Sequence, residues 1–434
     1  MKTIIMAGGK GTRIASVASD IPKPMIPLHG KPILEYQLEC LRENGLSDII
    51  IGIGHLGQAI QDYFGDGAKF GCHIVYYAET SPLGTAGALY KIAADPDYAL
   101  NTDFILLHGD TIFDLDFSRF IAFHYEKHAR VSLVAHPNSH PFDSALLITD
   151  SENRVIQWLN KEDPRQYYQN QVNAGVHILS KTLFTETQPD REKVDLDRDI
   201  LKPLISSGEG SVYAYSTPEY IKDMGTPDRY AQVAADIKKG LVKQRNLSHK
   251  QKAIFLDRDG TLNKLNGFIT KPEQFDLLDG VTDAIRAINE AGFLAIVITN
   301  QPVIARGEAT PDELRLIHNK LETELGKAGA YIDDIFFCPH HPDKGFAGER
   351  LEYKIDCNCR KPKPGMILSA ARKYNIDLSR SYMVGDDMKD VEAGRAAGCK
   401  AAILLADKAD ADAPAFPSLA AFVNSEIREK EARE

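Results

Sequence analysis

The stretch that decides the fold is AIFLDRDGTL, residues 253–262. Its apolar run Ala253–Leu256 predicts a buried strand. Asp257 and Asp259 follow two residues apart, so both are expected to face the crevice outside the carboxyl end of that strand, where open α/β sheets bind ligands. Half of a calcium loop is the alternative for this pattern, but no bidentate Glu follows at the spacing that such a loop requires.

Further apolar runs continue this pattern along the C-terminal half. Leu294–Ile298 and Ser381–Val384 predict two more strands. A helix is predicted over Val281–Ala291, stopped by Gly292, and another begins at the capping box Thr310-Pro311-Asp312-Glu313. Strands that alternate with helices predict a mostly parallel sheet covered on both faces.

The N-terminal half shows the same alternation. Buried strands are predicted at Thr3–Ala7, Asp48–Ile51, His73–Tyr77 and Phe104–Leu107, and helices at Ile33–Asn44 and Ala86–Ala94. The length of 434 residues allows two to three domains. Both halves therefore predict an α/β fold.

A basic stretch separates the two series. Lys238–Lys252 contains six Lys or Arg residues and no acidic residue. We favour a solvated linker here over a patch that binds nucleic acid or a membrane. The expected division is a first domain at 1–240, a linker at 241–252, a second domain at 253–408, and a tail at 409–434 that is frayed or helical and peripheral.

The composition excludes several classes of protein. The net charge of −10 argues against nonspecific nucleic-acid binding, and no apolar stretch approaches the roughly 18 residues that a membrane helix needs. The apolar run at the N-terminus ends at Gly8-Gly9, which is too short for a secretory signal, and six Cys do not make a disulfide framework in a chain of this length. We expect a cytoplasmic protein whose partners are small molecules; the sequence carries no signal of oligomeric state.

Three later elements complete the set that begins at Asp257. Thr299-Asn300 ends one predicted strand, Lys361 lies in Arg360-Lys361-Pro362, and Gly385-Asp386 ends another strand. In this order they resemble the haloacid-dehalogenase phosphatases, and the resemblance implies that fold for the C-terminal domain.

The same resemblance implies a role for each residue. Asp257 would attack phosphorus, and Asp259 would protonate the leaving oxygen and then activate water. The residues implied to bind the phosphoryl oxygens are Lys361, Thr299 and Asn300. Those implied to hold Mg²⁺ are Asp257, the Asp259 carbonyl and Asp386, with Asp390 orienting the outer shell.

The cysteines indicate a metal site. Cys338-Pro339-His340 and Cys357-Asn358-Cys359 offer three thiolates and an imidazole, the ligand set of a closed tetrahedral Zn²⁺ site. Cys-x-Cys forms a poor disulfide, so a structural metal that folds a long loop is favoured. His341 is an alternative ligand; the Cys-Pro-His order of the family points to His340.

The zinc pattern narrows the resemblance to a subgroup. Together with Gln301 and Ala305-Arg306-Gly307, it resembles the D,D-heptose 1,7-bisphosphate phosphatases; histidinol-phosphate phosphatases share the zinc pattern. The resemblance implies that Arg306 and Arg360 bind the second phosphate of the substrate, since guanidinium groups fit phosphate oxygens. Pro302-Val303-Ile304 departs from the usual Ser-Gly-Ile of the family.

A glycine-rich turn follows the first strand of the N-terminal half. Gly8-Gly9-Lys10-Gly11-Thr12-Arg13 has the backbone freedom and the positive charge that favour a polyphosphate, although its spacing is neither a Walker A loop nor a dinucleotide fingerprint. A plain tight turn is the alternative. Pro22 and Pro24 hold Lys23 in an extended segment, which would aim its ammonium group at a phosphate.

Together these pieces resemble the sugar-1-phosphate nucleotidyltransferases over about residues 1–235. Further matching segments are Pro82–Gly87, Gly109-Asp110, Asn173–Val176 and Asp223–Pro227. The resemblance implies that a triphosphate is cradled by Gly8, Gly9, Gly11, Thr12 and Gly84. Arg13 would hold pyrophosphate and Lys23 the α-phosphate. Asp110 and Asp223 would bind Mg²⁺, and Asn173 and Lys161 would contact the sugar.

The fusion of the two halves constrains the substrate. A phosphatase that removes the 7-phosphate of a heptose 1,7-bisphosphate makes the sugar-1-phosphate that a nucleotidyltransferase consumes. The joint resemblance is to bifunctional enzymes of GDP-D-glycero-α-D-manno-heptose synthesis, with two Rossmann-like domains. Two alternatives stay open: a histidinol-phosphate-type phosphatase joined to a different sugar transferase, and a catalytically inactive nucleotidyltransferase scaffold carrying an active phosphatase.

Overall fold

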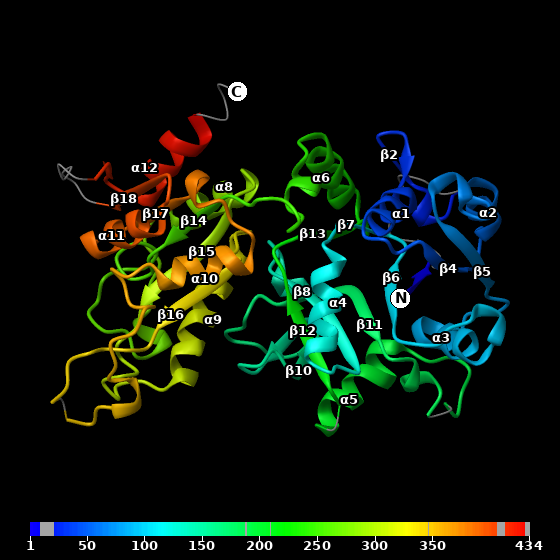
Figure 1. Ribbon diagram of the computed structural model, residues 1–434, viewed down its shortest axis with the longest axis horizontal. Coiled ribbons are helices and arrows are strands. Elements are labelled where there is room, and N and C mark those ends of the chain that lie inside the picture. Colours follow the sequence, from blue (N-terminus) through cyan, green and yellow to red (C-terminus); the bar gives the residue numbers. More distant parts are fainter. Residues whose placement is uncertain (9–20, 187–188, 209, 346, 406–412, 430–434) are drawn as a thin grey trace. The chain divides into compact units, whose positions relative to one another are not determined.

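The computed structural model describes residues 1–8, 21–186, 189–208, 210–345, 347–405 and 413–429 (Figure 1). The chain divides into two compact α/β units. The N-terminal unit comprises Met1–His136, Leu147–Asn160 and Asn173–Asn246, and the C-terminal unit comprises Pro137–Leu146, Lys161–Val172 and Leu247–Glu434. The break after Asn246 falls inside the stretch expected to be a linker. The two short segments contributed by the N-terminal half to the C-terminal unit were not predicted.

The C-terminal unit contains a six-stranded sheet in the order β16-β15-β14-β17-β18-β19. Its strands are β14 (Ala253–Leu256), β15 (Leu294–Asn300), β16 (Asp334–Cys338), β17 (Tyr382–Gly385), β18 (Ala401–Leu405) and β19 (Ala415–Phe416), and all five pairs are parallel. The strand order reverses between β14 and β17. Open parallel sheets bind ligands at such a switch point, outside the carboxyl ends of the strands.

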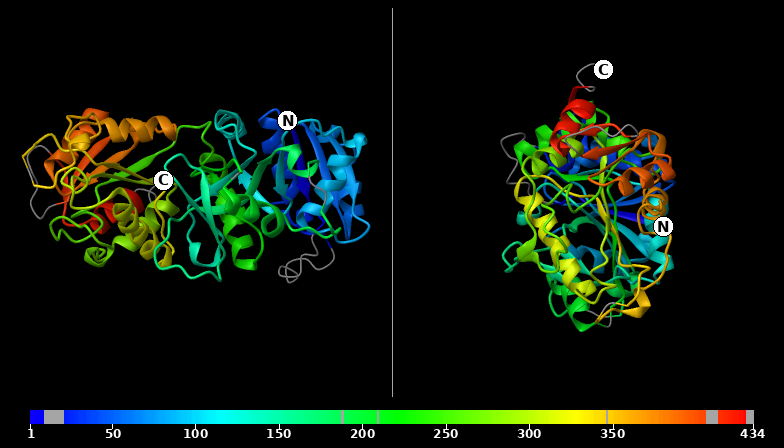
Figure 2. Two further views of the ribbon diagram at one scale, coloured as in Figure 1. Left: turned by 90° about the horizontal axis from the view of Figure 1, so that it is seen from below. Right: turned by 90° about the vertical axis from the view of Figure 1, so that its left-hand side faces the viewer.

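Helices cover both faces of this sheet, as the sequence predicts. Ile254 and Leu256 face one cluster of buried apolar residues and Ala253 and Phe255 the other, because successive strand residues point to opposite faces. The first cluster is completed by α8 (Val281–Glu290), α9 (Pro311–Lys327) and α12 (Leu419–Val423), and the second by α10 (Gly365–Lys373) and α11 (Met388–Ala397). The left view of Figure 2 shows the sheet between these two sets of helices.

The expectation of a peripheral tail is wrong for residues 419–427. Leu419, Phe422, Val423 and Ile427 are buried in the apolar core of the C-terminal unit. Their spacing of three and four residues places all of them on one face of the helix formed by α12 and the following turn, Asn424–Arg428. The charged residues after this segment concealed that apolar face in the sequence.

The expected linker is also more ordered than a solvated segment. Leu241–Gln244 forms the short helix α7, and Arg245 and Asn246 are buried. The Asn246 amide donates a hydrogen bond to Asp114 Oδ1, so the basic stretch packs onto the N-terminal unit rather than being free in solvent. Part of its positive charge is paired within that unit, since Lys243 Nζ lies 2.7 Å from Glu43 Oε2.

The N-terminal unit contains a mixed sheet with one parallel block of four strands. Strands β1 (Lys2–Met6), β4 (Asp48–Ile53), β5 (His73–Ala78) and β6 (Phe104–His108) are parallel in the order β5-β4-β1-β6, and β11 (Val172–Leu179) then pairs antiparallel with β6. The rest of the sheet is β8 (Val131–His136), β9 (Leu146–Thr149), β10 (Val155–Leu159) and β12 (Val212–Ser216). Its order reverses between β1 and β6, which again predicts a ligand site at that edge.

Shorter elements flank this sheet. The helices are α1 (Ile33–Glu43), α2 (Gly57–Phe64), α3 (Gly84–Ala94), α4 (Phe117–Glu126), α5 (Lys202–Ser207) and α6 (Pro227–Lys238). Two small antiparallel pairs are β2 (Pro27–Leu28) with β3 (Lys31–Pro32), and β7 (Thr111–Asp114) with β13 (Tyr220–Asp223). Within the described ranges, no helix is both long and apolar enough to cross a bilayer.

Candidate active sites

Two aspartates meet at the switch point of the C-terminal sheet. Asp257 follows β14 and Asp386 follows β17, and the backbone N–H of Asp257 donates to Val384 O at 2.9 Å. Asp390, on the first turn of α11, offers a third carboxylate, and all three have oxygens within 4.8 Å of one another. Gly260 must be glycine, since its φ is +86° and a Cβ there would lie 2.0 Å from Asp386 Oδ2.

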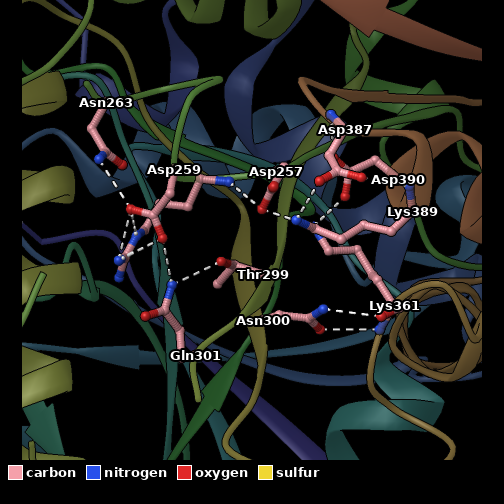
Figure 3. A network of polar contacts seen from close by, with 11 residues as sticks. Asp257, Asp259, Asn263, Thr299, Asn300, Gln301, Lys361, Asp387, Lys389 and Asp390 are labelled. Carbon is pink, nitrogen blue, oxygen red and sulfur yellow. Dashed lines mark hydrogen bonds and ion pairs between the residues drawn. The ribbon is translucent and has the colours of Figure 1, made fainter. Parts of the chain in front are cut away.

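Lys361 provides the positive charge of this cluster. Its side chain is fully buried, and its Nζ lies 2.7 Å from Asp257 Oδ1 and 2.7 Å from Asp390 Oδ1 (Figure 3). Burial and the charge of Asp257 raise the pKa of Asp386, and the same two causes raise the pKa of Asp390 to about 7. One ammonium group therefore does not neutralise three carboxylates. Carboxylate oxygens at these separations fit a hard divalent cation.

Two polar residues end the neighbouring strand β15. The side chain of Asn300 holds the backbone of Lys361, because Nδ2 donates to Lys361 O at 3.1 Å and Oδ1 accepts from Lys361 N at 3.0 Å. The Thr299 hydroxyl accepts from Gln301 Nε2 at 2.9 Å. Asn300 thus positions the lysine in this structure in addition to any contact with a phosphoryl group.

Asp259 lies in a different setting from Asp257. Its carboxylate accepts hydrogen bonds from the guanidinium of Arg258, from Asn263 Nδ2 and from Gln301 Nε2 (Figure 3). None of these three donors was assigned a role from the sequence. The only signal in the sequence was the position of Gln301 directly after the strand-end pair Thr299-Asn300.

The predicted cysteine cluster is assembled. Cys338 Sγ lies 3.4 Å from Cys357 Sγ and 3.3 Å from Cys359 Sγ, and His340 Nδ1 lies 3.4 Å from Cys359 Sγ. Hydrogen bonding from Cys338, ahead of that from Cys357 and His340, lowers the pKa of Cys359 to about 5. The grouping includes His340 and not His341, whose Nδ1 instead lies 3.8 Å from Asp343. Four such ligands could hold one tetrahedral metal ion.

The two arginines expected to bind a second phosphate lie on loops of the C-terminal unit. The Arg306 Nε donates to Glu308 at 2.7 Å, and its guanidinium stacks on the ring of Phe268 at 4.6 Å. Arg360 Nη1 donates to the carbonyl of His340 at 3.2 Å, next to the cysteine cluster.

A cavity of about 660 Å³ opens at the switch point of the N-terminal sheet. Four of the predicted residues line it: Gly8, Lys23, Gly84 and Asp110. Cavity residues that were not assigned from the sequence include His55, Glu79 and His108. Each follows or ends a strand, which was the available signal. Gly9, Gly11, Thr12 and Arg13 lie outside the described residues.

Lys23 and Asp110 are paired at this cavity. Lys23 begins a 3₁₀ turn, Lys23–Met25, and its Nζ lies 3.0 Å from Asp110 Oδ2. The chain at Asp223 runs beside the chain at Asp110, since the next residue, Met224, donates its N–H to Asp110 O at 2.9 Å. The Asp223 carboxylate itself is bound by Arg229, with Nη1 to Oδ2 at 2.6 Å. The backbones of the two predicted metal-binding residues are therefore neighbours, but their carboxylates contact different cations, and of the two only Asp110 lines the cavity.

The loop that begins α3 is closely packed. Gly84 has a φ of +80°, and a Cβ there would lie 2.4 Å from the carbonyl oxygen of Val194, so any side chain would displace backbone. This explains why the glycine is needed at the cavity wall.

The two predicted sugar-binding residues differ in their surroundings. Asn173 Oδ1 accepts hydrogen bonds from Gly175 N at 3.3 Å and from His177 Nε2 at 3.2 Å. Lys161 is 63% exposed and lies 3.6 Å from Glu162. Neither Asn173 nor Lys161 is among the residues that line the cavity. Exposure of this kind is typical of a solvated lysine, so the structure gives no support to its assigned contact.

Comparison with known proteins finds relatives of both halves of the chain. The Nucleotidyl transferase family model matches residues 2–240, and the HAD-hydrolase-like family model matches residues 358–429. The D-glycero-beta-D-manno-heptose-1,7-bisphosphate 7-phosphatase of Yersinia pestis is 43% identical over 35% of this chain and 79% of its own length. Mannose-1-phosphate guanylyltransferase of Mycobacterium tuberculosis is 30% identical over 55% of this chain and 65% of its own length. The crystal structure of HddC from Yersinia pseudotuberculosis is 28% identical, covering 54% of this chain and 99% of that chain, with a TM-score of 0.47.

Proposed function

Because the chain belongs to the nucleotidyl transferase family and, in its C-terminal half, to the family of haloacid-dehalogenase-like sugar bisphosphate phosphatases, we propose that it catalyses two consecutive steps. The C-terminal site removes the 7-phosphate from a heptose 1,7-bisphosphate. The N-terminal site transfers a nucleotidyl group, expected to be GMP, to the heptose 1-phosphate and releases pyrophosphate. The observation that carries the proposal is the buried Lys361, whose Nζ lies 2.7 Å both from Asp257, directly after β14, and from Asp390, on the first turn of α11.

The phosphatase step follows from the arrangement of the carboxylates. An Asp257 oxygen attacks phosphorus, the bond from phosphorus to the sugar oxygen breaks, and Asp259 gives its proton to that leaving oxygen. A water molecule then attacks the aspartyl phosphate, Asp259 takes its proton, and phosphate leaves Asp257. Lys361 and Thr299 balance the phosphoryl charge, while Asn300 fixes the lysine backbone.

The transferase step requires neutralisation of a crowded anion. A sugar-1-phosphate oxygen attacks the α-phosphorus of the triphosphate, and pyrophosphate leaves. Lys23 is positioned to bind the α-phosphate at the cavity edge. Gly8 and Gly84 let backbone approach the nucleotide closely, and the roles of Gly9, Gly11, Thr12 and Arg13 rest on their motif alone.

Metal ions are part of the proposal at three places. Asp257, Asp386 and the Asp259 carbonyl would hold Mg²⁺ in the phosphatase, and Asp110 and Asp223 would hold it in the transferase. Mg²⁺ supplies charge neutralisation for phosphoryl oxygens. The soft ligands Cys338, His340, Cys357 and Cys359 fit Zn²⁺ with every position filled by protein, so its role is structural. Metal analysis of the purified protein tests this: one zinc per chain is expected, and none in a Cys357→Ser, Cys359→Ser variant.

The nucleobase can be argued from Glu79. This carboxylate lines the cavity, and burial raises its pKa. Among the common bases only guanine presents two adjacent N–H donors to one carboxylate, which supports GTP as the substrate. Product analysis by mass spectrometry with all four triphosphates tests this choice; GDP-heptose as the main product is expected, and an equal yield from ATP would contradict it.

Substrate choice in the phosphatase has a direct test. The Yersinia pestis phosphatase named above acts, by its name, on the β-anomer, whereas the proposed GDP-heptose product carries the α-configuration. Rates with α- and β-heptose 1,7-bisphosphate and with histidinol phosphate separate the candidates. Faster turnover of histidinol phosphate would reject the heptose proposal for this site.

A further inference from the structure

We infer that Gln301 is a positioning residue of the phosphatase: its side-chain amide holds the Asp259 carboxylate and the Thr299 hydroxyl in one fixed arrangement. The inference rests on the proposed function for the role of Asp259. Gln301 is only 2% exposed and follows β15 directly. Figure 3 shows it bridging the two residues.

The orientation of the Gln301 amide is fixed by its partners. The atom facing Asp259 Oδ2, at 2.8 Å, is the amide nitrogen, which donates a hydrogen bond to that oxygen. The same nitrogen lies 2.9 Å from Thr299 Oγ1. Its two hydrogens are thus divided between Asp259 and Thr299.

This division has a consequence for Thr299. Its hydroxyl oxygen accepts from Gln301, so its own hydrogen is turned away from Gln301 and is available to another acceptor. Thr299 is almost fully buried at the end of the strand beside Asp257, where that acceptor would be a phosphoryl oxygen. Gln301 therefore orients a donor for the substrate without touching the substrate.

The other side of Asp259 is held by charge. Arg258 is completely buried, and its Nε and Nη2 donate to Asp259 Oδ1 at 3.1 and 2.9 Å. Asn263 Nδ2 adds a third bond to the same oxygen at 3.0 Å. Oδ1 therefore has three donors, whereas Oδ2 accepts from Gln301 Nε2 and from Arg258 Nη2, the latter at 2.9 Å. Oδ2 is the less crowded oxygen, and we assign to it the exchange of a proton with a leaving group or water.

The backbone of Gln301 is anchored separately. Its N–H donates to the carbonyl of Cys338 at 2.8 Å, at the end of β16. Cys338 is also a member of the cysteine cluster, so the strand end that carries the cluster fixes the residue that orients Asp259. A substitution of the Gln301 side chain leaves this backbone bond intact.

The test compares two leaving groups. The leaving oxygen of an alkyl phosphate, such as the heptose bisphosphate, needs a proton. The second substrate, nitrophenyl phosphate, releases nitrophenolate, which leaves without one. The informative ratio is kcat/KM for the alkyl phosphate divided by kcat/KM for nitrophenyl phosphate. It reports the proton transfer, because kcat/KM covers steps only up to formation of the aspartyl phosphate. We expect Gln301→Met, which keeps the shape and removes the donors, to lower this ratio about 10- to 100-fold, below the full contribution of a general acid.

Two further variants make the result specific. Gln301→Glu places an acceptor against Asp259 and is expected to lower the ratio further than Gln301→Met. In an Asp259→Asn background, Gln301→Met is expected to leave the ratio unchanged, since the group it orients has been removed. Gln274→Met, the same substitution on a partly exposed turn of the C-terminal unit, is the control and is expected to leave both rates unchanged.

Several outcomes would overturn the inference. Equal losses with both substrates would make Gln301 merely structural, as would an effect that persists in the Asp259→Asn background. No loss at all would remove its role. If the unmodified protein hydrolyses nitrophenyl phosphate but not heptose bisphosphate, the proposed substrate fails while the inference is still tested with any alkyl phosphate that is turned over.

Discussion

In the C-terminal unit Lys361 lies fully buried, 2.7 Å from each of two carboxylates, whereas in the N-terminal unit Lys23 meets Asp110 at 3.0 Å on the wall of an open cavity. In the first site Asp257 and Asp386 follow paired parallel strands, and the backbone of Lys361 is held by Asn300 at the end of β15. In the second site Lys23 lies in the 3₁₀ turn Lys23–Met25, and Asp223 lies on the small β7–β13 pair. The charges of the phosphatase centre are thus positioned by its parallel sheet directly or through one hydrogen-bonded neighbour, whereas those of the transferase centre depend more on turns and loops outside its main sheet.

The largest effect is expected at the most buried centre. Asp257→Asn removes the nucleophile and is expected to lower phosphate release by about 10⁴-fold or more, without changing pyrophosphate release from heptose 1-phosphate and GTP. Coupled assays for the two products measure this in one preparation. Asp283→Asn, on an exposed helix face, is the matched control. A parallel loss of pyrophosphate release would show that the two sites are not independent.

The corresponding change at the cavity is expected to be smaller. Lys23→Ala removes a charge partner of the transition state and is expected to slow pyrophosphate release about 10²–10³-fold, with phosphate release unchanged. Lys69→Ala, an exposed lysine of the same unit, serves for comparison. Unchanged turnover in Lys23→Ala would remove that lysine from the site and favour the scaffold alternative.

The stability of the C-terminal unit is expected to depend on pH through Glu322. This residue is buried, accepts a bond from Asn170 N at 3.3 Å, and has its pKa raised by burial to about 8. Between its usual pKa and about 8 the folded chain holds a proton that the unfolded chain has lost, so stability is full at acidic pH and falls as the pH rises through this window. The difference between the two pKa values corresponds to a loss of about 5 kcal/mol in the free energy of unfolding across this window.

Glu322→Gln is expected to abolish the fall in stability of the C-terminal unit with rising pH. Denaturant unfolding followed through phosphatase activity measures this. Glu324→Gln, a more exposed neighbour on the same helix, is the control. Trp158, the single tryptophan of the chain, belongs to the N-terminal unit, so its fluorescence reports the unfolding of that unit. A shift of the Trp158 transition in Glu322→Gln would mean that the two units do not unfold separately.

The smallest expected effects come from two helix caps. Thr310 caps α9 by accepting from Glu313 N at 3.1 Å, and Thr226 caps α6 by accepting from Arg229 N at 3.3 Å. Each Thr→Ala change is expected to cost about 1 kcal/mol of stability in its own unit. Thr226→Ala is also expected to slow pyrophosphate release, because Arg229 binds Asp223, while Thr310→Ala leaves both activities unchanged. Equal effects on activity would contradict the loop dependence of the transferase site.

The parallel part of each sheet could be predicted from the sequence. Apolar runs such as Ala253–Leu256 and Leu294–Ile298 are local signals, and the structure confirms strands there. The cysteine cluster was equally readable, because ligand type and spacing are both local. The capping box at Thr310 is present as expected.

What the sequence did not reveal depends on contacts between distant residues. The antiparallel β11, the packing of 161–172 within the C-terminal unit and the burial of α12 are decided by tertiary packing rather than by local periodicity. Glu79 and His108 are ordinary residues at strand ends until the fold places them on a cavity wall. The bridge made by Gln301 joins side chains 42 residues apart, and no local spacing announces it.

One time course tests the account most directly. Purified protein is given heptose 1,7-bisphosphate, GTP and Mg²⁺, and released phosphate and pyrophosphate are followed together. The account predicts that phosphate appears first, that pyrophosphate follows after a lag, and that the two reach equal amounts as GDP-heptose accumulates. Pyrophosphate without prior phosphate, or phosphate with no pyrophosphate at all, would contradict two consecutive activities in this chain.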